Sequence, residues 1–272
     1  MPELPEVETV VRGLRGPLVG RTIISAQYDY PGGLVVPDGP IFTARIANQP
    51  IRSVGRRGKY IVIKLDPDTL IIHLKMTGRL YVVPDDATDH ADRWVHFLFQ
   101  LDNAHQLRFS DSRKFGRVYL VDDPAEVLDR LGPEPLADDF TLDAFRACFA
   151  RRKGALKPLL LNQAIVAGVG NIYADEALYR ARLHPLRRAD TLTDDELVAL
   201  YTALRQVLAD GITREGASVN WYRKPDGTKG NAQTGLQVYG HAGEPCPRCG
   251  TPILKTVVGQ RGTHLCPACQ IP

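Results

Sequence analysis

Apolar residues recur every three or four positions along residues 4–18, which is the spacing of one face of an α-helix. These apolar positions are Leu4, Val7, Val10, Val11, Leu14 and Leu18. Pro5 suits the first turn of a helix, and Glu6 and Glu8 suit the positive end of its dipole. The pattern predicts an amphipathic helix whose apolar stripe faces a core.

Between residues 21 and 121 the pattern changes to short runs rich in Ile, Val, Leu, Tyr and Phe, which is typical of β-strands. The predicted strands are residues 21–30, 51–65, 69–75, 79–83, 94–101, 106–109 and 117–121. Residues 66–68 (Asp-Pro-Asp) and 102–104 (Asp-Asn-Ala) are suited to hairpin connections. Many short strands without intervening helices predict a sandwich or barrel.

The pattern changes again at residues 132–136 (Gly-Pro-Glu-Pro-Leu), which predict a stiff linker. Helical spacing follows over residues 142–152, 157–164, 173–182 and 193–214. Thr193 and Glu196 predict a capping box at the start of the last of these helices. Cys148 is interpreted as a buried core thiol. The polar residues 216–235 are expected to form a flexible loop.

The chain is therefore expected to be an α+β protein of several domains. The predicted parts are a β-sandwich domain with an N-terminal helix (1–131), a linker (132–140), a helical domain (141–237) and a cysteine-containing module (238–272).

Composition narrows the class of protein only a little. Of the 272 residues 44% are hydrophobic and 24% charged, which describes an ordinary globular chain, and the net charge of 34 − 31 = +3 is mildly basic. No apolar run approaches the ~20 residues of a membrane span, and no signal peptide opens the chain. We expect an intracellular protein with no membrane partner.

Four of the five cysteines lie in the last 27 residues, as Cys246-x-x-Cys249 and Cys266-x-x-Cys269 with sixteen residues between the pairs. This spacing is typical of a four-thiolate zinc site, which has no ligand position left for catalysis. We expect one structural Zn²⁺. A hairpin between the pairs would hold Arg261 outward, where it could clamp a phosphate, although a solvated turn residue is the commoner case.

The second residue carries the first candidate chemistry. Initiator methionine is normally removed before a residue as small as Pro2, and this would leave a free secondary amine. An α-amino group titrates at roughly 7.7–8.0, so part of it is an unprotonated nucleophile, and Glu3 beside it is a candidate acid. An ordinary helix start remains the alternative.

Other candidates lie at turns. Lys59 could protonate a leaving oxygen or hold a phosphate. Alternatively, it is an ordinary lysine on the solvent-facing side of a strand. Met76, Arg113 and Phe115 suit wedges that fill the space left by an extruded base, although Met76 and Phe115 could equally belong to the core.

The segment Gly168-Val169-Gly170-Asn171 lies between two predicted helices. Such a turn offers backbone N–H groups to an anion, and Asn171 could cap the helix, bind phosphate or do both. With Lys153 and Lys157 before it, the element is interpreted as a helix–turn–helix on a DNA backbone, against the alternative of a solvated basic face.

Taken in order, these segments resemble the formamidopyrimidine-DNA glycosylases over essentially the whole chain. The matching segments are PELPEVET, RRGKY, HLKMTGRL, SRKFGR, LGPEPL, KPLLLNQ, AGVGNIYADEAL, LQVYG and CPRCG…RGTHLCPACQ. The resemblance implies a monomeric bacterial repair enzyme of the cytoplasm and nucleoid. Its partner would be double-stranded DNA containing oxidised bases or abasic sites. It would excise oxidised purines and then cleave the abasic site by β,δ-elimination.

The resemblance also assigns domains and residues. It makes residues 1–131 the catalytic domain, 141–237 a helix–two-turn–helix DNA-binding domain and 238–272 a zinc finger. It makes Pro2 the Schiff-base nucleophile, Glu3 the acid that assists sugar opening, Lys59 a proton-transfer and phosphate residue, and Arg261 a phosphate contact linked to δ-elimination. The implied DNA contacts are His90, Arg113, Lys153, Lys157, Asn171, Met76 and Phe115. The implied lesion pocket consists of Glu6, Ser218 and Tyr222.

Two departures from the family pattern leave alternatives open. The first concerns His90, whose register is uncertain because the family's Lys-His-x-His run is absent. The second concerns the lesion-capping loop, where residues 217–222 (Ala-Ser-Val-Asn-Trp-Tyr) replace the usual Gly-Ser/Thr-Thr start. An endonuclease VIII-like enzyme acting on oxidised pyrimidines is the runner-up, although Leu4 stands where its members have Gly. A damage-sensing binder without catalysis is the third candidate, although binding alone would not need Pro2, Glu3 and Lys59.

Overall fold

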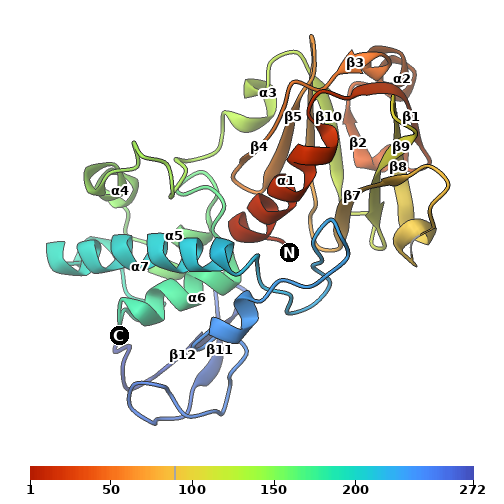
Figure 1. Cartoon of the computed structure of the whole chain (residues 1–272). Helices are drawn as coiled ribbons and strands as arrows, with labels where there is room; N and C mark the ends of the chain where they lie inside the picture. The colour runs from red at the N-terminus through yellow and green to blue at the C-terminus, as the bar shows by residue number, and fades with distance from the viewer. Residues whose placement is uncertain (89) are drawn as a thin grey trace. The chain divides into compact units, whose positions relative to one another are not determined.

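The computed structural model describes residues 1–88 and 90–272 and divides the chain into two compact units. The first unit consists of Met1–Asp129 and Glu215–Asn231, and the second of Arg130–Arg214 and Ala232–Pro272. The first unit is rich in strands, whereas the second is mainly helical and contains a small hairpin (Figure 1). The α+β fold class is confirmed, and the domain boundaries proposed from the sequence stay a prediction.

Helix α1 (Leu4–Leu18) begins the first unit, and its predicted apolar stripe is fully buried. The helix packs against β4 (Ser53–Arg57) and β7 (Gly78–Pro84), which are edge strands of two different sheets. The N-terminal segment is thereby held against the sandwich.

Two sheets form the sandwich. The first sheet has the order β3 (Gln49–Pro50), β1 (Thr22–Tyr28), β8 (Val95–Leu101), β9 (His105–Asp111) and β7. The second has the order β2 (Leu34–Val36), β10 (Arg117–Val121), β6 (Thr69–His73), β5 (Tyr60–Lys64) and β4. Their inward side chains and the α1 stripe make one core that includes Phe97, Phe99, Ile61, Ile63 and Leu70. The predicted sandwich and both predicted hairpin turns, β5 to β6 and β8 to β9, are confirmed.

The prediction of one strand over residues 51–65 is wrong, because β4 and β5 form a hairpin there with Gly58 and Lys59 in its turn. Gly58 has φ +56, which a glycine adopts without strain. The sequence pattern also missed β2, β3 and α2 (Gly39–Ile46). They are short, and α2 buries only Phe42 and Ile46, so its periodicity is weak.

The second unit is built on four α-helices: α4 (Leu142–Phe149), α5 (Leu156–Leu161), α6 (Asn171–Arg180) and α7 (Asp194–Thr213). The Thr193 capping box is confirmed, since Glu196 N donates to Thr193 Oγ1 at 3.2 Å and Thr193 N donates to Glu196 Oε2 at 2.9 Å. The interpretation of Cys148 as a core thiol is wrong: it is half-buried, because α4 turns Phe145 and Phe149 inward instead.

Short elements complete the described chain. They are η1 (Pro31–Gly33), η2 (His90–Trp94), α3 (Ala125–Leu128), η3 (Ala189–Thr191), η4 (Ala232–Gly235), β11 (Leu254–Val258) and β12 (Arg261–Leu265). Across the residues described, no helix combines the length and the apolar character needed to cross a membrane.

Candidate active site and nucleic-acid interface

The start of the chain is held by one carboxylate of α1. Pro2 and Glu3 are both buried. Glu6 Oε2 accepts a hydrogen bond from Glu3 N at 2.8 Å, and Glu6 Oε1 accepts one from Ala217 N at 2.7 Å. Glu6 therefore ties the proposed nucleophile segment to the loop Glu215–Asn231, which belongs to the same unit.

The other two predicted lesion-pocket residues lie in this loop. Ser218 Oγ donates to Tyr222 O at 3.1 Å and accepts from Gly230 N at 3.0 Å. Tyr222 packs in the sandwich core, where burial and the nearby Glu6 carboxylate raise the pKa of its hydroxyl. The structure brings Glu6, Ser218 and Tyr222 into one connected region, and their contact with a damaged base stays a prediction.

Lys59 occupies the turn between β4 and β5, and only 4% of its surface is exposed. The adjacent His73, at the end of β6, pairs with Tyr60, and its Nδ1 accepts a hydrogen bond from Lys75 N at 3.0 Å. Burial, with Lys75 and Lys59 nearby, lowers the pKa of His73 to about 3. His73 therefore stays neutral at physiological pH beside the cations Lys59 and Lys75.

One buried carboxylate organises the two turns that carry the predicted wedges. Asp111 accepts hydrogen bonds from the backbone N–H groups of Arg113 at 3.2 Å, Phe115 at 2.7 Å and Gly116 at 2.6 Å. The hydroxyl of Thr77, the neighbour of Met76, also donates to it. The turns after β6 and β9 are thus fixed by the same side chain.

The wedge side chains themselves point outward from these turns. Met76 is 41% exposed and Phe115 is 43% exposed, so the alternative that they belong to the core is wrong. The Arg113 guanidinium lies over the Phe115 ring at 4.6 Å from its centroid. An apolar pair beside a stacked cation is suited to insertion into a base stack.

The sequence does not mark His73 or Asp111 as site residues. Strand pairing places His73 opposite Tyr60, the neighbour of Lys59, and turn geometry places Asp111 beside the turn of Arg113 and Phe115. Strand β6 is buried along its whole length, so its pattern gives His73 neither a face nor a partner. The side chain of His90, a predicted DNA contact, lies outside the part of the chain that the structure describes, and its backbone opens η2.

In the second unit Lys157 corrects a prediction. Its side chain is fully buried, and Nζ lies 2.6 Å from Asp175 Oδ1, 2.7 Å from Thr263 Oγ1 and 3.0 Å from Gly262 O. An ammonium group with three donors committed inside the protein does not reach a DNA phosphate. Lys157 instead joins α5, α6 and the β11–β12 hairpin.

Asn171 supports the same hairpin. Gly170, and not Asn171, is the N-cap of α6, so the capping interpretation is wrong. Asn171 Nδ2 donates to Gly262 O at 2.9 Å, while its Oδ1 is buried without a hydrogen-bond partner among the described residues. The start of α6 and the strand that carries Arg261 are therefore held together.

Two predicted phosphate contacts of this unit are exposed. Arg261 begins β12, directly after a turn in which Gly259 and Gln260 have φ of +55 and +61, and Lys153 precedes α5. The predicted hairpin with Gly in its turn is confirmed. Positive side chains on a rigid hairpin and beside a helix start are suited to binding a phosphate backbone.

We expect Lys157→Ala to lower the free energy of unfolding of the second unit by about 3–5 kcal/mol, since it leaves Asp175 buried without its ion pair. Thermal unfolding monitored by calorimetry measures this change. The exposed Lys153→Ala is the matched control, with an expected change below about 0.5 kcal/mol. Equal stability of the two variants would contradict the supporting role of Lys157.

The four cysteines fit a zinc ion. Their sulfur atoms all lie within 4.8 Å of one another, with Sγ–Sγ distances of 3.9 Å for Cys246–Cys269 and 3.5 Å for both Cys249–Cys266 and Cys249–Cys269. Tetrahedral coordination at about 2.3 Å would place the sulfurs roughly 3.8 Å apart. The prediction of one structural zinc is confirmed, and this module holds the hairpin that bears Arg261.

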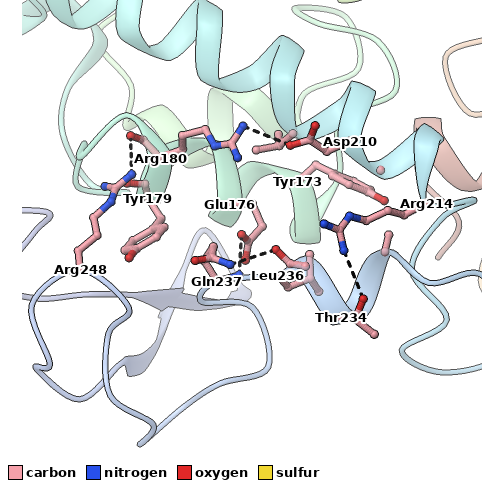
Figure 2. Close-up of a pocket in the computed structure, with 14 residues that line it drawn as sticks. Tyr173, Glu176, Tyr179, Arg180, Asp210, Arg214, Thr234, Leu236, Gln237 and Arg248 are labelled. Atoms are coloured by element: carbon pink, nitrogen blue, oxygen red, sulfur yellow. Dashed lines mark hydrogen bonds and ion pairs between the residues drawn. The ribbon is translucent and has the colours of Figure 1, made fainter.

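A cavity of about 380 Å³ lies within the second unit between α6, α7 and η4 (Figure 2). Burial raises the pKa of Glu176, whose carboxylate accepts hydrogen bonds from the backbone N–H groups of Gln237, Val238 and Tyr239 at 2.9–3.0 Å. None of the predicted site residues that the structure describes lines this cavity. Its contacts anchor the zinc module to α6.

Three family models match the chain in order. They describe a formamidopyrimidine-DNA glycosylase N-terminal domain (residues 1–118), the H2TH domain of the same enzymes (131–222), and a zinc finger found in FPG and IleRS (243–271). The formamidopyrimidine-DNA glycosylase of Herpetosiphon aurantiacus is 49% identical over 99% of this chain and 100% of its own length.

Solved structures give the same result. The MutM (Fpg) protein of Thermus thermophilus has a TM-score of 0.88 and 42% identity, and the alignment covers 99% of this chain and 98% of that one. A Lactococcus lactis Fpg bound to DNA containing an abasic site has a TM-score of 0.91 and 37% identity, with 99% and 100% covered.

Proposed function

This chain belongs to the formamidopyrimidine-DNA glycosylase family, and on that premise we propose that it excises oxidised purines, such as 8-oxoguanine and formamidopyrimidines, from double-stranded DNA. We propose further that it then cleaves the abasic site by β,δ-elimination. The placement of Pro2 and Glu3 supports both the excision and the cleavage that we propose. Both residues are buried, and hydrogen bonds through Glu6 connect their segment to loop 215–231.

The first chemical step uses the N-terminal amine. In the structure Met1 acylates the Pro2 nitrogen, so the mechanism requires its removal, which frees a lone pair on a secondary amine. This nitrogen attacks C1′ of the damaged nucleotide, the bond from C1′ to the base breaks, and the base leaves with the proton that the amine nitrogen releases. Glu3 donates a proton as the C1′–O4′ bond opens, and the product is an iminium ion between Pro2 and the sugar.

The iminium ion then acts as an electron sink. Loss of a proton from C2′ expels the 3′ phosphate, and loss of a second proton along the conjugated chain expels the 5′ phosphate. In this proposal Lys59 transfers protons or holds a phosphate, and Arg261 stabilises the phosphate that leaves in the second elimination. The cations near His73 favour such anionic groups.

The remaining side chains hold the DNA. Enzymes that act on a base inside a duplex must extrude it, and this leaves a gap in the stack. Met76, Arg113 and Phe115 would fill that gap, and their fixed, exposed turns support this role. Lys153, Asn171 and Arg261 would contact phosphates, with zinc holding the Arg261 hairpin in position and taking no part in the chemistry.

Borohydride trapping tests this function. The trimmed protein, mixed with an 8-oxoguanine duplex and reductant, is expected to give a covalent protein–DNA adduct and a cleaved strand. A stable complex without an adduct would mean a damage-sensing binder. An adduct with oxidised pyrimidines alone would mean an endonuclease VIII-like enzyme, an interpretation that Leu4 disfavours.

We expect Arg261→Ala to weaken DNA binding and to reduce the slope of log affinity against log salt by about one unit, as for the loss of one phosphate contact. Titrations of a lesion duplex at several salt concentrations measure the slope. Lys255→Ala, which removes an exposed positive charge from the same hairpin, is the control. Equal slopes for the two variants would remove Arg261 from the interface.

We also propose that the protein acts as a monomer on bacterial chromosomal DNA in the cytoplasm. The curated relatives are bacterial proteins, and several solved relatives are complexes with damaged DNA. Sedimentation of the protein with a lesion duplex is expected to give one protein per duplex.

A further inference from the structure

Two of the four zinc ligands are buried, so their sulfur atoms need hydrogen-bond donors from the protein. Cys266 is fully buried and Cys246 is 3% exposed. Zinc binds each cysteine as a thiolate, and four thiolates around one Zn²⁺ carry a net charge of 2 − 4 = −2. Backbone N–H groups supply part of the compensation, since Arg248 N donates to Cys246 Sγ at 3.4 Å. Donors of this kind help to decide how firmly the metal is held.

A tyrosine of α6 adds a side-chain donor to the same sulfur. Tyr179 Oη lies 3.3 Å from Cys246 Sγ in a buried contact. A zinc-bound sulfur has lost its proton, so the hydroxyl is the donor when the metal is present. Tyr179 is 2% exposed, and its ring packs with Val238 and Ile253 in the core of the zinc module. The ring is therefore fixed with its hydroxyl at the sulfur.

Arg248, which lies between the first two zinc ligands, holds this tyrosine in place. Its guanidinium lies over the Tyr179 ring, 4.4 Å from the centroid. Nη1 donates to Tyr179 O at 2.7 Å and Nη2 donates to Arg180 O at 3.1 Å (Figure 2). Both carbonyl groups belong to the last turn of α6, where a cation also interacts favourably with the helix dipole. The ligand turn and α6 therefore hold each other through Arg248 and Tyr179.

We propose that the Tyr179 hydroxyl is part of the zinc centre: by donating to the Cys246 thiolate it withdraws negative charge from the sulfur and slows the loss of zinc. Tyr179 is a positioning residue in this role, because it acts on the metal through Cys246 and touches no substrate. The same helix begins at Asn171, which contacts the hairpin of Arg261. The inference concerns the metal centre alone and does not depend on the proposed base excision.

Release of zinc from the full-length protein tests this role. Tyr179→Phe removes the hydroxyl and keeps the buried ring. We expect its zinc affinity to fall roughly 10- to 100-fold, the range for loss of a group that supports a metal ligand, with faster transfer of zinc to a chromogenic chelator. Tyr201→Phe is the matched control, because it removes from α7 a tyrosine hydroxyl that donates to Phe140 O at 2.8 Å, outside the zinc module. It should release zinc as the wild type does.

Cobalt substitution gives a second measurement, which does not depend on the stability of the unit. Thiolate-bound Co²⁺ has a sulfur-to-metal charge-transfer band, and a hydrogen bond to the sulfur raises the energy of this band because it stabilises the sulfur lone pairs. In Co²⁺-substituted Tyr179→Phe we expect the band to move to longer wavelength, whereas Tyr201→Phe should leave it unmoved. An unmoved band in Tyr179→Phe, or zinc release as slow as in the wild type, would overturn the inference. Equally fast release from Tyr201→Phe would also overturn it, because the effect would then be a general loss of stability.

Discussion

Insertion of one lysine between Met1 and Pro2 is expected to abolish excision and cleavage, with a fall on the order of 10³-fold or more. A bulky second residue prevents removal of methionine, and the proline nitrogen then stays in a peptide bond without a nucleophilic lone pair. Single-turnover cleavage of an 8-oxoguanine duplex and borohydride trapping measure the effect.

The control for this insertion is Pro2→Ala, which is still trimmed and leaves a primary amine at the same place. It is expected to retain a trappable adduct at a lower rate. The affinity of the lysine-insertion variant for an abasic-analogue duplex shows whether that variant still folds and binds DNA. Wild-type rates of adduct formation in the inserted protein would contradict the proposed nucleophile.

Loss of zinc is expected to lower DNA affinity by roughly 100-fold, comparable to removing a central arginine of an interface. Cys266→Ser removes a fully buried thiolate from the four-sulfur cluster. Zinc-finger peptides gain about 10–16 kcal/mol from the metal, so the β11–β12 hairpin should lose its fixed position. The β-sandwich has its own core, and its unfolding temperature is expected to stay unchanged.

Cys148→Ser provides the matched control for zinc loss, because Cys148 lies on α4, outside the cluster, and is half-buried. It should retain both the metal and the affinity. Zinc content, duplex titration and calorimetry give the three readings. A Cys266→Ser protein that lacks zinc but binds DNA as tightly as the wild type would show that the module does not support binding.

Local patterns in the sequence were enough for the α1 stripe, the Thr193 capping box and the cysteine site, because each depends on neighbours within a few residues or on fixed spacing. The split of residues 51–65 into a hairpin was missed, since an apolar run on both sides of Gly58 and Lys59 resembles one strand. The family resemblance, which covers the whole chain, supplied the candidate chemistry that periodicity could not.

Lys157 shows what sequence reasoning could not reach. It lies near Arg151, Arg152 and Lys153, so the sequence groups it with a solvent-facing basic run. Its partners are Asp175 and a carbonyl 105 residues away, and only the tertiary fold brings them together. The sequence likewise leaves the position of Met76 and Phe115 open, whereas the structure exposes both side chains on turns that Asp111 fixes.

The most direct test of the central claim is mass spectrometry of the borohydride-trapped complex after digestion. The mechanism predicts that the reduced sugar is attached to the nitrogen of Pro2 in a peptide that lacks Met1. Attachment to Lys59 or to another internal lysine, with the N-terminal peptide unmodified, would contradict it.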